Sequence, residues 1–319
     1  MLLAPAALHI PDGFLSTAVA LVGWLFAIIL IGLALRQTSG QLGERQIPMM
    51  GVLAAFIFAA QAINFPVAAG TSGHLLGGAL AALVMGPWIG TLIMTAVIVV
   101  QGLLFQDGGL LVMGWNIVNM GVITAFTGYA VYSLSLRILG KRHSAYLTGA
   151  FIGGWLSVVM GAIVTSFELA LSGSSPKELV VPAMTGVHAL IGLGEGLITV
   201  GAVSLLLMSR PEVIKRAEIA PGRRGANFIA AALLIILLIT ALSPLASPDP
   251  DGLEKVATGQ GFLALGEAPQ YEIFPDYVIP LIENSALTTI LAVLIGTVVV
   301  FAIGLLIGRS ASRRQGAGD

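Results

Sequence analysis

Long apolar runs constrain this chain more than any other feature of its sequence. Nine runs stand between residues 14 and 308, and most are long enough to cross the ~30 Å hydrocarbon core of a bilayer as a helix. They cover residues 14–36, 47–63, 74–86, 88–105, 112–136, 145–171, 182–208, 226–245 and 285–308. Lipid offers the backbone no hydrogen-bond partners, and runs of this length without alternation favour helices over the strands of a barrel. The sequence therefore predicts an all-α polytopic membrane protein.

Composition agrees with a chain that spends most of its length in lipid. Of the 319 residues, 57% are hydrophobic and 10% are charged, whereas soluble domains average about 45–50% and about 25%. The mean hydropathy is +0.97. We expect membrane lipid around most of the chain and no nucleic-acid partner.

Residues 74–105 decide the number of spans. As one helix they would be about 48 Å long, too long for the hydrocarbon core, and Gly86-Pro87 favours two short spans joined by a tight reversal. With nine spans and the N-terminus outside, 13 of the 15 basic residues lie in cytoplasmic loops, as the positive-inside rule requires. The 13 are Arg36, Arg45, Arg137, Lys141, Arg142, Arg210, Lys215, Arg216, Arg223, Arg224, Arg309, Arg313 and Arg314. A single span over 74–105 would reverse every later loop and destroy this bias.

A change in composition divides the chain into two units. Residues 1–208 are predicted to form a seven-span bundle, and residues 209–225 a basic cytoplasmic linker. Residues 226–319 then form a two-span hairpin whose outer loop, residues 246–284, holds seven acidic residues and one lysine. The C-terminus is predicted to be cytoplasmic. We find no defensible internal repeat.

The N-terminal polar segment, His9 to Gly13, is the first candidate for chemistry. Pro11 fixes its own φ and moves Ile10 out of the helical region, and Asp12-Gly13 is typical of a turn. The chain has only four histidines, and neutral imidazole is the commonest metal ligand in proteins. The predicted topology puts His9 on the outer face with the loops at 64–73, 106–109 and 172–181.

His74 is the second candidate, because it opens the third span at the same outer face. Gly70, Ser72 and Gly73 before it allow a close approach of the backbone, and Gln61 and Asn64 are spaced to turn their amides toward it. The alternative is a solvated loop with an incidental histidine.

Two further polar groups lie in predicted spans. His188 and Glu195, seven residues apart, share one face of the seventh span, and ionisable groups inside a membrane are functional candidates by default. They are predicted to support the site rather than to bind metal directly, and a packed polar pair is the alternative. Asn116, with Asn119 three residues on, is a pocket candidate, although a hydrogen-bond seam between helices explains the pair as well.

Close helix packing is the simplest explanation for the small-residue spacings of the chain. They include Gly149, Gly153, Gly154, Gly192 and Gly196.

Absent motifs exclude several functions. The chain contains no cysteine, so thiol catalysis and Cys-zinc sites are excluded. It lacks a G-x-x-x-x-G-K-[ST] segment and an H-E-x-x-H segment, which argues against an ATPase and a zincin protease. Carboxylates are scarce in the seven-span part, so a calcium or magnesium cage is not expected. Nitrogen ligands with few oxygens suit nickel, cobalt or copper.

Four motifs occur in the order seen in one transporter family. They are His-Ile-Pro-Asp-Gly-Phe-Leu-Ser (9–16), Phe-Pro-Val-Ala-Ala-Gly-Thr-Ser-Gly-His-Leu-Leu-Gly-Gly (65–78), Gln-Gly-Leu-Leu-Phe-Gln-Asp-Gly-Gly (101–109) and His-Ala-Leu-Ile-Gly-Leu-Gly-Glu (188–195). Together they resemble the CbiM/NikM family, the substrate-binding membrane components of cobalt and nickel energy-coupling-factor (ECF) transporters. Residues 250–254, Pro-Asp-Gly-Leu-Glu, resemble the PDGLE domain, which is often a separate accessory protein of the nickel-type members.

The resemblance implies a four-nitrogen, roughly square-planar metal site. Its ligands are a free terminal amine, the next amide nitrogen, the imidazole of that second residue and a second histidine. On this chain the imidazoles are His9 and His74, and the amide belongs to His9. Family members begin Met-His, whereas Leu8 precedes His9 here. We therefore expect the mature chain to start at Leu8, either after removal of residues 1–7 or because Leu8 is the true initiator.

The expected function is capture of Co²⁺ or Ni²⁺, with a slight preference for nickel, at the outer face of a prokaryotic cell (inner) membrane. The resemblance implies a transmembrane coupling protein and cytoplasmic ATPase subunits as partners; the metal is cargo, and no resident cofactor or enzymatic activity is expected. One alternative is a vitamin-binding or organic-solute-binding component of an ECF transporter, against which the 7% aromatic content speaks weakly. The other is a membrane metalloenzyme built on His188 and Glu195.

Overall fold

A computed structural model describes residues 9–39, 46–209, 211, 214, 224–271 and 273–313 of the chain. In this part of the chain, six helices are long and apolar enough to cross a membrane. Leu8 and most of the predicted linker at 209–225 lie outside the described residues. The all-helical membrane architecture predicted from the apolar runs is confirmed.

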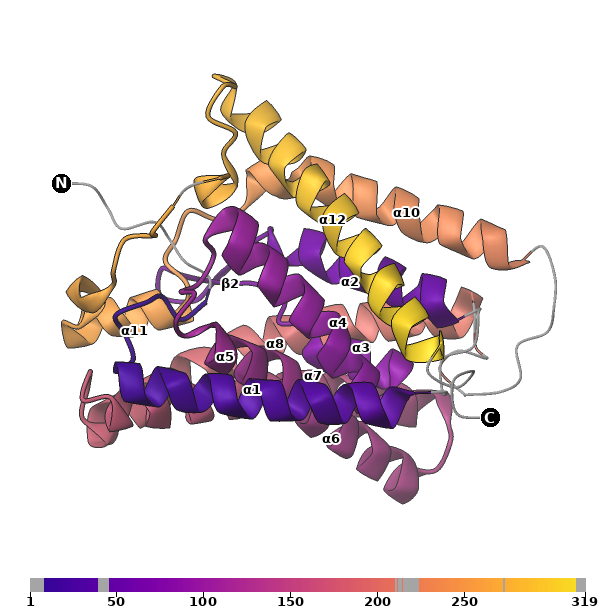
Figure 1. Cartoon of the computed structure of the whole chain (residues 1–319). Helices are drawn as coiled ribbons and strands as arrows, with labels where there is room; N and C mark the ends of the chain where they lie inside the picture. Colours follow the sequence, from indigo (N-terminus) through magenta and orange to yellow (C-terminus); the bar gives the residue numbers. More distant parts are fainter. Residues whose placement is uncertain are drawn as a thin grey trace.

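The elements, in order along the chain, are α1 (Thr17–Thr38), α2 (Gln46–Gln61), β1 (Phe65–Val67), β2 (Thr71–Gly73), α3 (Gly78–Met85), α4 (Pro87–Val100), the π-helical turn η1 (Gln101–Phe105), α5 (Met113–Asn116), the π-helical stretch η2 (Ile117–Ile123), α6 (Thr124–Leu139), α7 (His143–Leu171), α8 (Lys177–Ser209), α10 (Arg224–Leu242), η3 (Ser243–Leu245), α11 (Gly252–Gln260), η4 (Leu263–Leu265), η5 (Pro275–Tyr277) and α12 (Ser285–Arg313). Helices distant in sequence pack together, since α1 lies against α4 and α5 and α2 lies against α10 and α12, and Figure 1 shows α12 crossing over the body.

The predicted helical span over 74–86 is only partly helical. Residues 65–73, expected to be a loop, form a small antiparallel hairpin in which Phe65 pairs with Gly73. The chain then runs on without helix to Gly77, whose φ of +82° favours glycine, and α3 is only eight residues long. Gly86, also at positive φ, reverses the chain, and Pro87 starts α4 at a position where its missing N–H costs nothing. The tight reversal expected at Gly86-Pro87 is therefore present.

Glycines let the helices of the body approach closely, as their spacing predicted. A Cβ on Gly153 of α7 would lie 2.7 Å from the backbone oxygen of Gly128 in α6. On the other side of α7, the Cβ of a residue at 154 would lie 3.2 Å from Gly196 Cα in α8. The packing of α6, α7 and α8 thus depends on positions without side chains.

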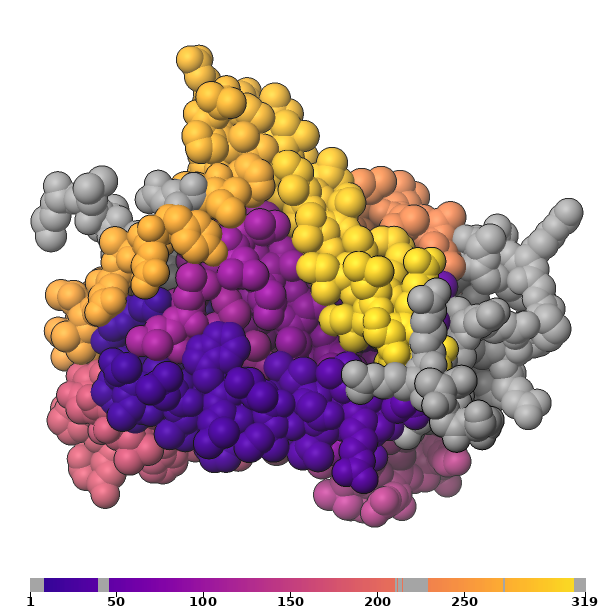
Figure 2. Space-filling model, in the orientation of Figure 1, coloured from indigo at the N-terminus to yellow at the C-terminus, as the bar shows by residue number. Residues whose placement is uncertain are grey.

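The C-terminal helices pack on α2. A Cβ on Gly304 of α12 would lie 3.1 Å from Gly51 Cα, and a Cβ on Gly296 would lie 2.1 Å from the ring of Phe58. The connecting segment between α10 and α12 folds over the end of the body that carries His9, and Figure 2 shows it lying against the N-terminal segment and the 101–112 region.

The surface of α1 carries large apolar side chains that a water-soluble protein would bury. Leu21, Leu25 and Ile28 are 57%, 58% and 64% exposed, and α1 lies across the face of the molecule drawn in Figure 2. Lipid is the solvent that these residues match.

Gly153→Ala should destabilise the body, because the added methyl group meets the backbone of α6 rather than a flexible side chain. Overpacking of this kind costs about 1–3 kcal/mol, which a lower midpoint of thermal unfolding in detergent would report. Gly201→Ala on α8 is the matched control, since nothing lies within 4 Å of its Cβ and alanine favours the helix. Equal midpoints for the two variants would contradict the close-packing account.

Candidate metal site

Three of the four histidines line one small cavity at the same end of the bundle. The cavity has a volume of about 80 Å³, and His9, His74 and His188 reach it from the N-terminal segment, the segment after β2 and α8. His9 and His74 are 2% and 6% exposed. His143 begins α7 and does not line this cavity.

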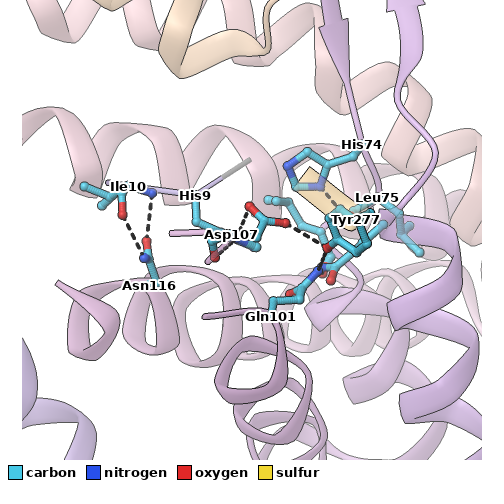
Figure 3. Close-up of polar contacts among 10 residues, drawn as sticks. His9, Ile10, His74, Leu75, Gln101, Asp107, Asn116 and Tyr277 are labelled. Carbon is cyan, nitrogen blue, oxygen red and sulfur yellow. Dashed lines mark hydrogen bonds and ion pairs between the residues drawn. The ribbon is translucent and has the colours of Figure 1, made fainter. Parts of the chain in front are cut away.

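Asp107 holds the imidazole of His9. The Nδ1 atom of His9 lies 2.9 Å from the Asp107 carbonyl oxygen and 3.0 Å from its Oδ1 (Figure 3). A carbonyl oxygen only accepts, so Nδ1 carries a proton, and Nε2 is buried with no hydrogen-bond partner among the described residues. In the neutral ring, Nε2 is therefore the nitrogen with a lone pair for a ligand.

Each of these two side chains, His9 and Asp107, also shifts the pKa of the other. Burial lowers the pKa of His9, but the facing Asp107 carboxylate raises it, and the net pKa lies above the ordinary 6.5. Burial raises the pKa of Asp107, whereas the charge and hydrogen bond of His9 and the hydroxyl of Tyr277 lower it, and the net pKa lies below 3.8. A metal ion arriving at this imidazole competes with a proton.

Polar side chains fix the backbone on either side of His9. Asn116 accepts from the Ile10 N–H at 3.1 Å and donates to the Ile10 carbonyl at 3.1 Å, as a neighbouring strand would. The Asp12 carboxylate accepts from three consecutive backbone N–H groups, those of residues 110–112, at 2.9–3.2 Å. Gly108, at φ +96°, passes so close that a Cβ would lie 2.7 Å from the His9 Cβ.

A second carboxylate fixes the backbone that follows His74. Glu195 of α8 accepts from the N–H groups of Leu76 and Gly77 at 2.6 and 3.0 Å, and Gln61 of α2 donates to the Leu76 carbonyl at 2.8 Å. The His74 Nδ1 donates to the Leu75 carbonyl at 3.0 Å, so Nε2 is the ring nitrogen not used in that bond. Charge-assisted bonds to buried N–H groups are strong, and they hold a non-helical segment inside the bundle.

The rings of His9 and His74 are close enough to share one metal ion. Their centroids are 6.0 Å apart and their planes meet at 69°. With metal–nitrogen bonds of about 2.0–2.1 Å, two imidazoles on one ion have centroids separated by about 4.5–6.5 Å, depending on the angle at the metal. Within the described residues, no three side chains of His, Asp or Glu are grouped to hold a metal ion, so the two rings would need further ligands from elsewhere.

His188 lies beside this pair rather than in it. Its Nδ1 donates to the Met184 carbonyl at 2.8 Å, and a Cβ on Gly252 would lie 2.9 Å from its Nε2. The packed His188–Glu195 pair, considered above as the alternative, is not formed in the described part of the chain, where the Glu195 carboxylate accepts from the backbone after His74.

The remaining predicted residues surround the cavity in different ways. Asn119 joins η2 to α7 through Thr165 and Glu168, which is the interhelical seam considered above. The Ser72 hydroxyl donates to the Asp249 carbonyl at 2.7 Å. The backbone oxygen of Asn64 accepts from the Ser247 N–H at 2.8 Å, and its side-chain oxygen is buried without a partner in the described part. The amide of Asn64 is thus not seen to support His74.

Three site residues were not predicted as such. Asp107 stood in the quoted 101–109 motif and Asp251 in the PDGLE motif, but neither was assigned a role. Asp251 lines the cavity and caps α11 by accepting from the Glu254 N–H at 2.7 Å. Tyr277, which binds Asp107 through its hydroxyl at 2.9 Å, carried no sequence signal at all.

Two family profiles match the chain, and together they cover most of it. Residues 9–213 match CbiM, described as the cobalt uptake substrate-specific transmembrane region. Residues 226–313 match the PDGLE domain.

Individual relatives agree with this division. The chain is 37% identical to a putative fused nickel transport protein NikMN of Archaeoglobus fulgidus, over 95% of this chain and 99% of that protein. It is 28% identical to the fused nickel transport protein NikMN of Rhodobacter capsulatus, over 97% of this chain and 100% of that protein. The fold is similar to a crystal structure of a truncated transition metal transporter, with a TM-score of 0.57 and 30% identity over 63% of this chain and 98% of that one.

Glu195→Gln should destabilise the segment after His74, because the amide can place an NH₂ group against one of two backbone N–H donors. Losing one charge-assisted hydrogen bond to a buried group costs about 1.5–3 kcal/mol, seen as a lower thermal midpoint and faster proteolysis at 62–77. Glu178→Gln on the same helix is the control, since its side chain is 70% exposed. A Glu195→Gln protein as stable as that control would contradict the role given to this carboxylate.

Proposed function

This chain belongs to the CbiM family of cobalt uptake transmembrane regions and carries a C-terminal PDGLE domain. We propose that it captures Ni²⁺ or Co²⁺ at the external face of the cell membrane for an ECF importer. It is a multi-pass component of a prokaryotic cobalt/nickel transport system and not an enzyme. The coupling protein and the ATPase subunits are separate partners in this proposal, consistent with the absence of a P-loop motif.

The observation that carries the proposal is the convergence of two imidazoles on a cavity of about 80 Å³. Pockets for organic ligands have volumes of roughly 300–1,000 Å³, so the histidine cavity suits an ion and not a vitamin. A metalloenzyme on His188 and Glu195 lacks support, because Glu195 is occupied by backbone N–H groups.

The ligands we assign are the imidazoles of His9 and His74. Asp107 supports a bond through Nε2 of His9, since metal-binding histidines usually donate their other N–H to a carboxylate or carbonyl. A chelate that includes the His9 amide closes only through Nδ1, and that mode requires the ring to leave Asp107. A terminal amine at Leu8 would complete the mode through Nδ1, and Leu8 lies outside the described residues.

Nine crossings with the N-terminus outside belong to the same proposal. The loops that this topology puts outside contact one another at one end: Asp12 binds residues 110–112, Ser174 donates to the Phe14 carbonyl, and Ser72 binds Asp249. The third crossing combines the non-helical residues 74–77 with α3. Irregular backbone is tolerated at this depth because protein, not lipid, surrounds it.

An acidic groove supports entry of a cation from this end. Its volume is about 500 Å³, and the described residues that line it include four carboxylate side chains and no basic residue. They are Asp12, Glu254, Glu267 and Asp276. Such a groove raises the local concentration of cations.

Nickel is the preferred cargo in this proposal, and residues 1–208 and 226–319 act as body and accessory domain. The two relatives that share the fused arrangement over nearly the whole chain are named as nickel transport proteins. The profile of the body is described for cobalt, so a direct comparison of the metals is needed.

His9→Ala or His74→Ala should abolish metal uptake by cells that express the chain with its partners, because each removes one nitrogen ligand. Membrane insertion and amount should be unchanged. His143→Ala is the matched control, since this histidine is exposed and lies outside the cavity. Metal uptake at the wild-type level in both His9→Ala and His74→Ala would contradict the assignment of these residues as ligands.

Calorimetric titration of the purified chain should give a lower Kd for Ni²⁺ than for Co²⁺, because nickel favours tetragonal nitrogen ligation. Mass spectrometry of the same sample should find the chain starting at residue 8. An intact residue 1 in a protein that binds metal at full affinity would remove the amine from the site, and tighter binding of Co²⁺ would reverse the preference.

A further inference from the structure

A carboxyl group that the metal site does not use is buried behind the histidine cavity. Glu168 lies in the last turn of α7 and is 2% exposed. Its Oε2 atom accepts from Asn119 Nδ2 of η2 at 2.9 Å, and the same nitrogen donates to Thr165 Oγ1 at 3.1 Å. Asn119 and Thr165 line the cavity, so Glu168 is held against the outer side of the wall that they form.

Two oxygen atoms of this pair have no hydrogen-bond partner in the described part of the chain. They are Oε1 of Glu168 and Oδ1 of Asn119. When Glu168 is ionised, both atoms only accept, so neither can satisfy the other. Buried polar atoms without a partner are rare and costly. A proton on the carboxyl group changes this, because the acid then donates through its O–H, and the Asn119 oxygen is the acceptor that the pair leaves unused.

No cation balances a charge on Glu168 among the described residues. The elements packed against α7 are α3, α6, α8 and η2, of which α3 and η2 carry no titratable residue. Those of α6, α7 and α8, apart from Glu168, are Tyr129, Tyr132, Arg137, His143, Tyr146, Lys177, Glu178, His188 and Glu195.

Glu168 forms no ion pair with any of these residues. Lys177, the cation that follows it most closely along the chain, is 68% exposed and lies 3.9 Å from Glu178. Across the cavity, His188 donates to the Met184 carbonyl.

A charge in this position would be expensive, because protein and lipid take the place of water around it. We propose that Glu168 is a proton-binding site behind the histidine cavity: it keeps its proton at neutral pH and pairs with Asn119 as a neutral carboxylic acid. The wall of Asn119 and Thr165 then presents no carboxylate charge to a cation in the cavity. This disfavours Ca²⁺ and Mg²⁺, which prefer charged oxygen ligands, and leaves the nitrogen atoms as the stronger ligands.

The test is the infrared spectrum of the purified full-length chain at neutral pH. A protonated carboxyl group has a C=O stretching band apart from those of ionised carboxylates and of the backbone, and this band shifts when D₂O replaces H₂O. We expect the band in the wild type and its loss in Glu168→Gln. Glu178→Gln on α8 is the matched control, because its side chain is 70% exposed, and it should keep the band. Equal spectra for the wild type and Glu168→Gln in this region would overturn the inference.

The pairing with Asn119 has its own signature in the same spectrum. In Asn119→Leu, the acid no longer accepts from the amide N–H, so its band should move to higher frequency. A band that keeps its frequency in this variant would show that Asn119 is not the partner and would overturn the inference as stated.

Stability as a function of pH gives a second, independent readout. In the unfolded chain Glu168 meets water, where a glutamate is ionised above about pH 5, whereas the folded chain keeps its proton. The folded chain therefore binds one proton more, and the ratio of folded to unfolded wild type should fall by up to about tenfold per pH unit as the pH rises toward neutrality. Glu168→Gln, which has the shape of the acid and no proton to lose, should lack this component.

The comparison is the difference in stability between the wild type and Glu168→Gln. A difference that is independent of pH, or that grows in favour of the wild type as the pH rises, would show an ionised Glu168 in the folded chain and overturn the inference. Neither measurement uses a metal ion, so both stand or fall separately from the assignment of His9 and His74 as ligands.

Discussion

The structure depends on how buried, non-helical backbone finds hydrogen-bond partners within a bundle that lipid surrounds. A carboxylate accepts two or three such bonds at once, and the chain uses one on each side of its cavity. Asp12 binds the N–H groups of residues 110–112, and Glu195 binds those of Leu76 and Gly77. Two of the scarce carboxylates of the body therefore hold the segments that carry His9 and His74. A third, Asp107, accepts from the His9 ring itself.

Much of the fold could be predicted from the sequence, because lipid imposes a simple rule on apolar runs. The six long helices, the reversal at Gly86-Pro87 and the close packing around Gly153 follow from span length, turn chemistry and small-residue spacing. The non-helical chain at 74–77 did not, since hydropathy alone does not report the backbone conformation of a short buried segment. What reveals it is the pair of bonds from Glu195, a contact between positions 119 residues apart.

The candidate site was also predicted only in part from the sequence. The scarcity of histidine drew attention to His9 and His74, whose rings lie 6.0 Å apart. Their orientation could not be predicted, because it depends on the bonds of Nδ1 to carbonyl groups that no residue type specifies. The contact of Tyr277 with Asp107 could not be predicted for a further reason. It is one tyrosine of five in the chain, and the contacts of Tyr271, Phe274 and Tyr277 with η1 bring it to Asp107.

Because the accessory domain is fused to the body, the two are always close to each other. Separate proteins would be so only at high concentration. Tethering keeps Tyr277 near Asp107 at a high effective concentration, so docking does not require a diffusing partner. The contacts of Tyr277 therefore join the C-terminal part of the chain to the turn that carries Asp107. Asp12 and Asn116 hold the backbone beside His9 independently of those contacts.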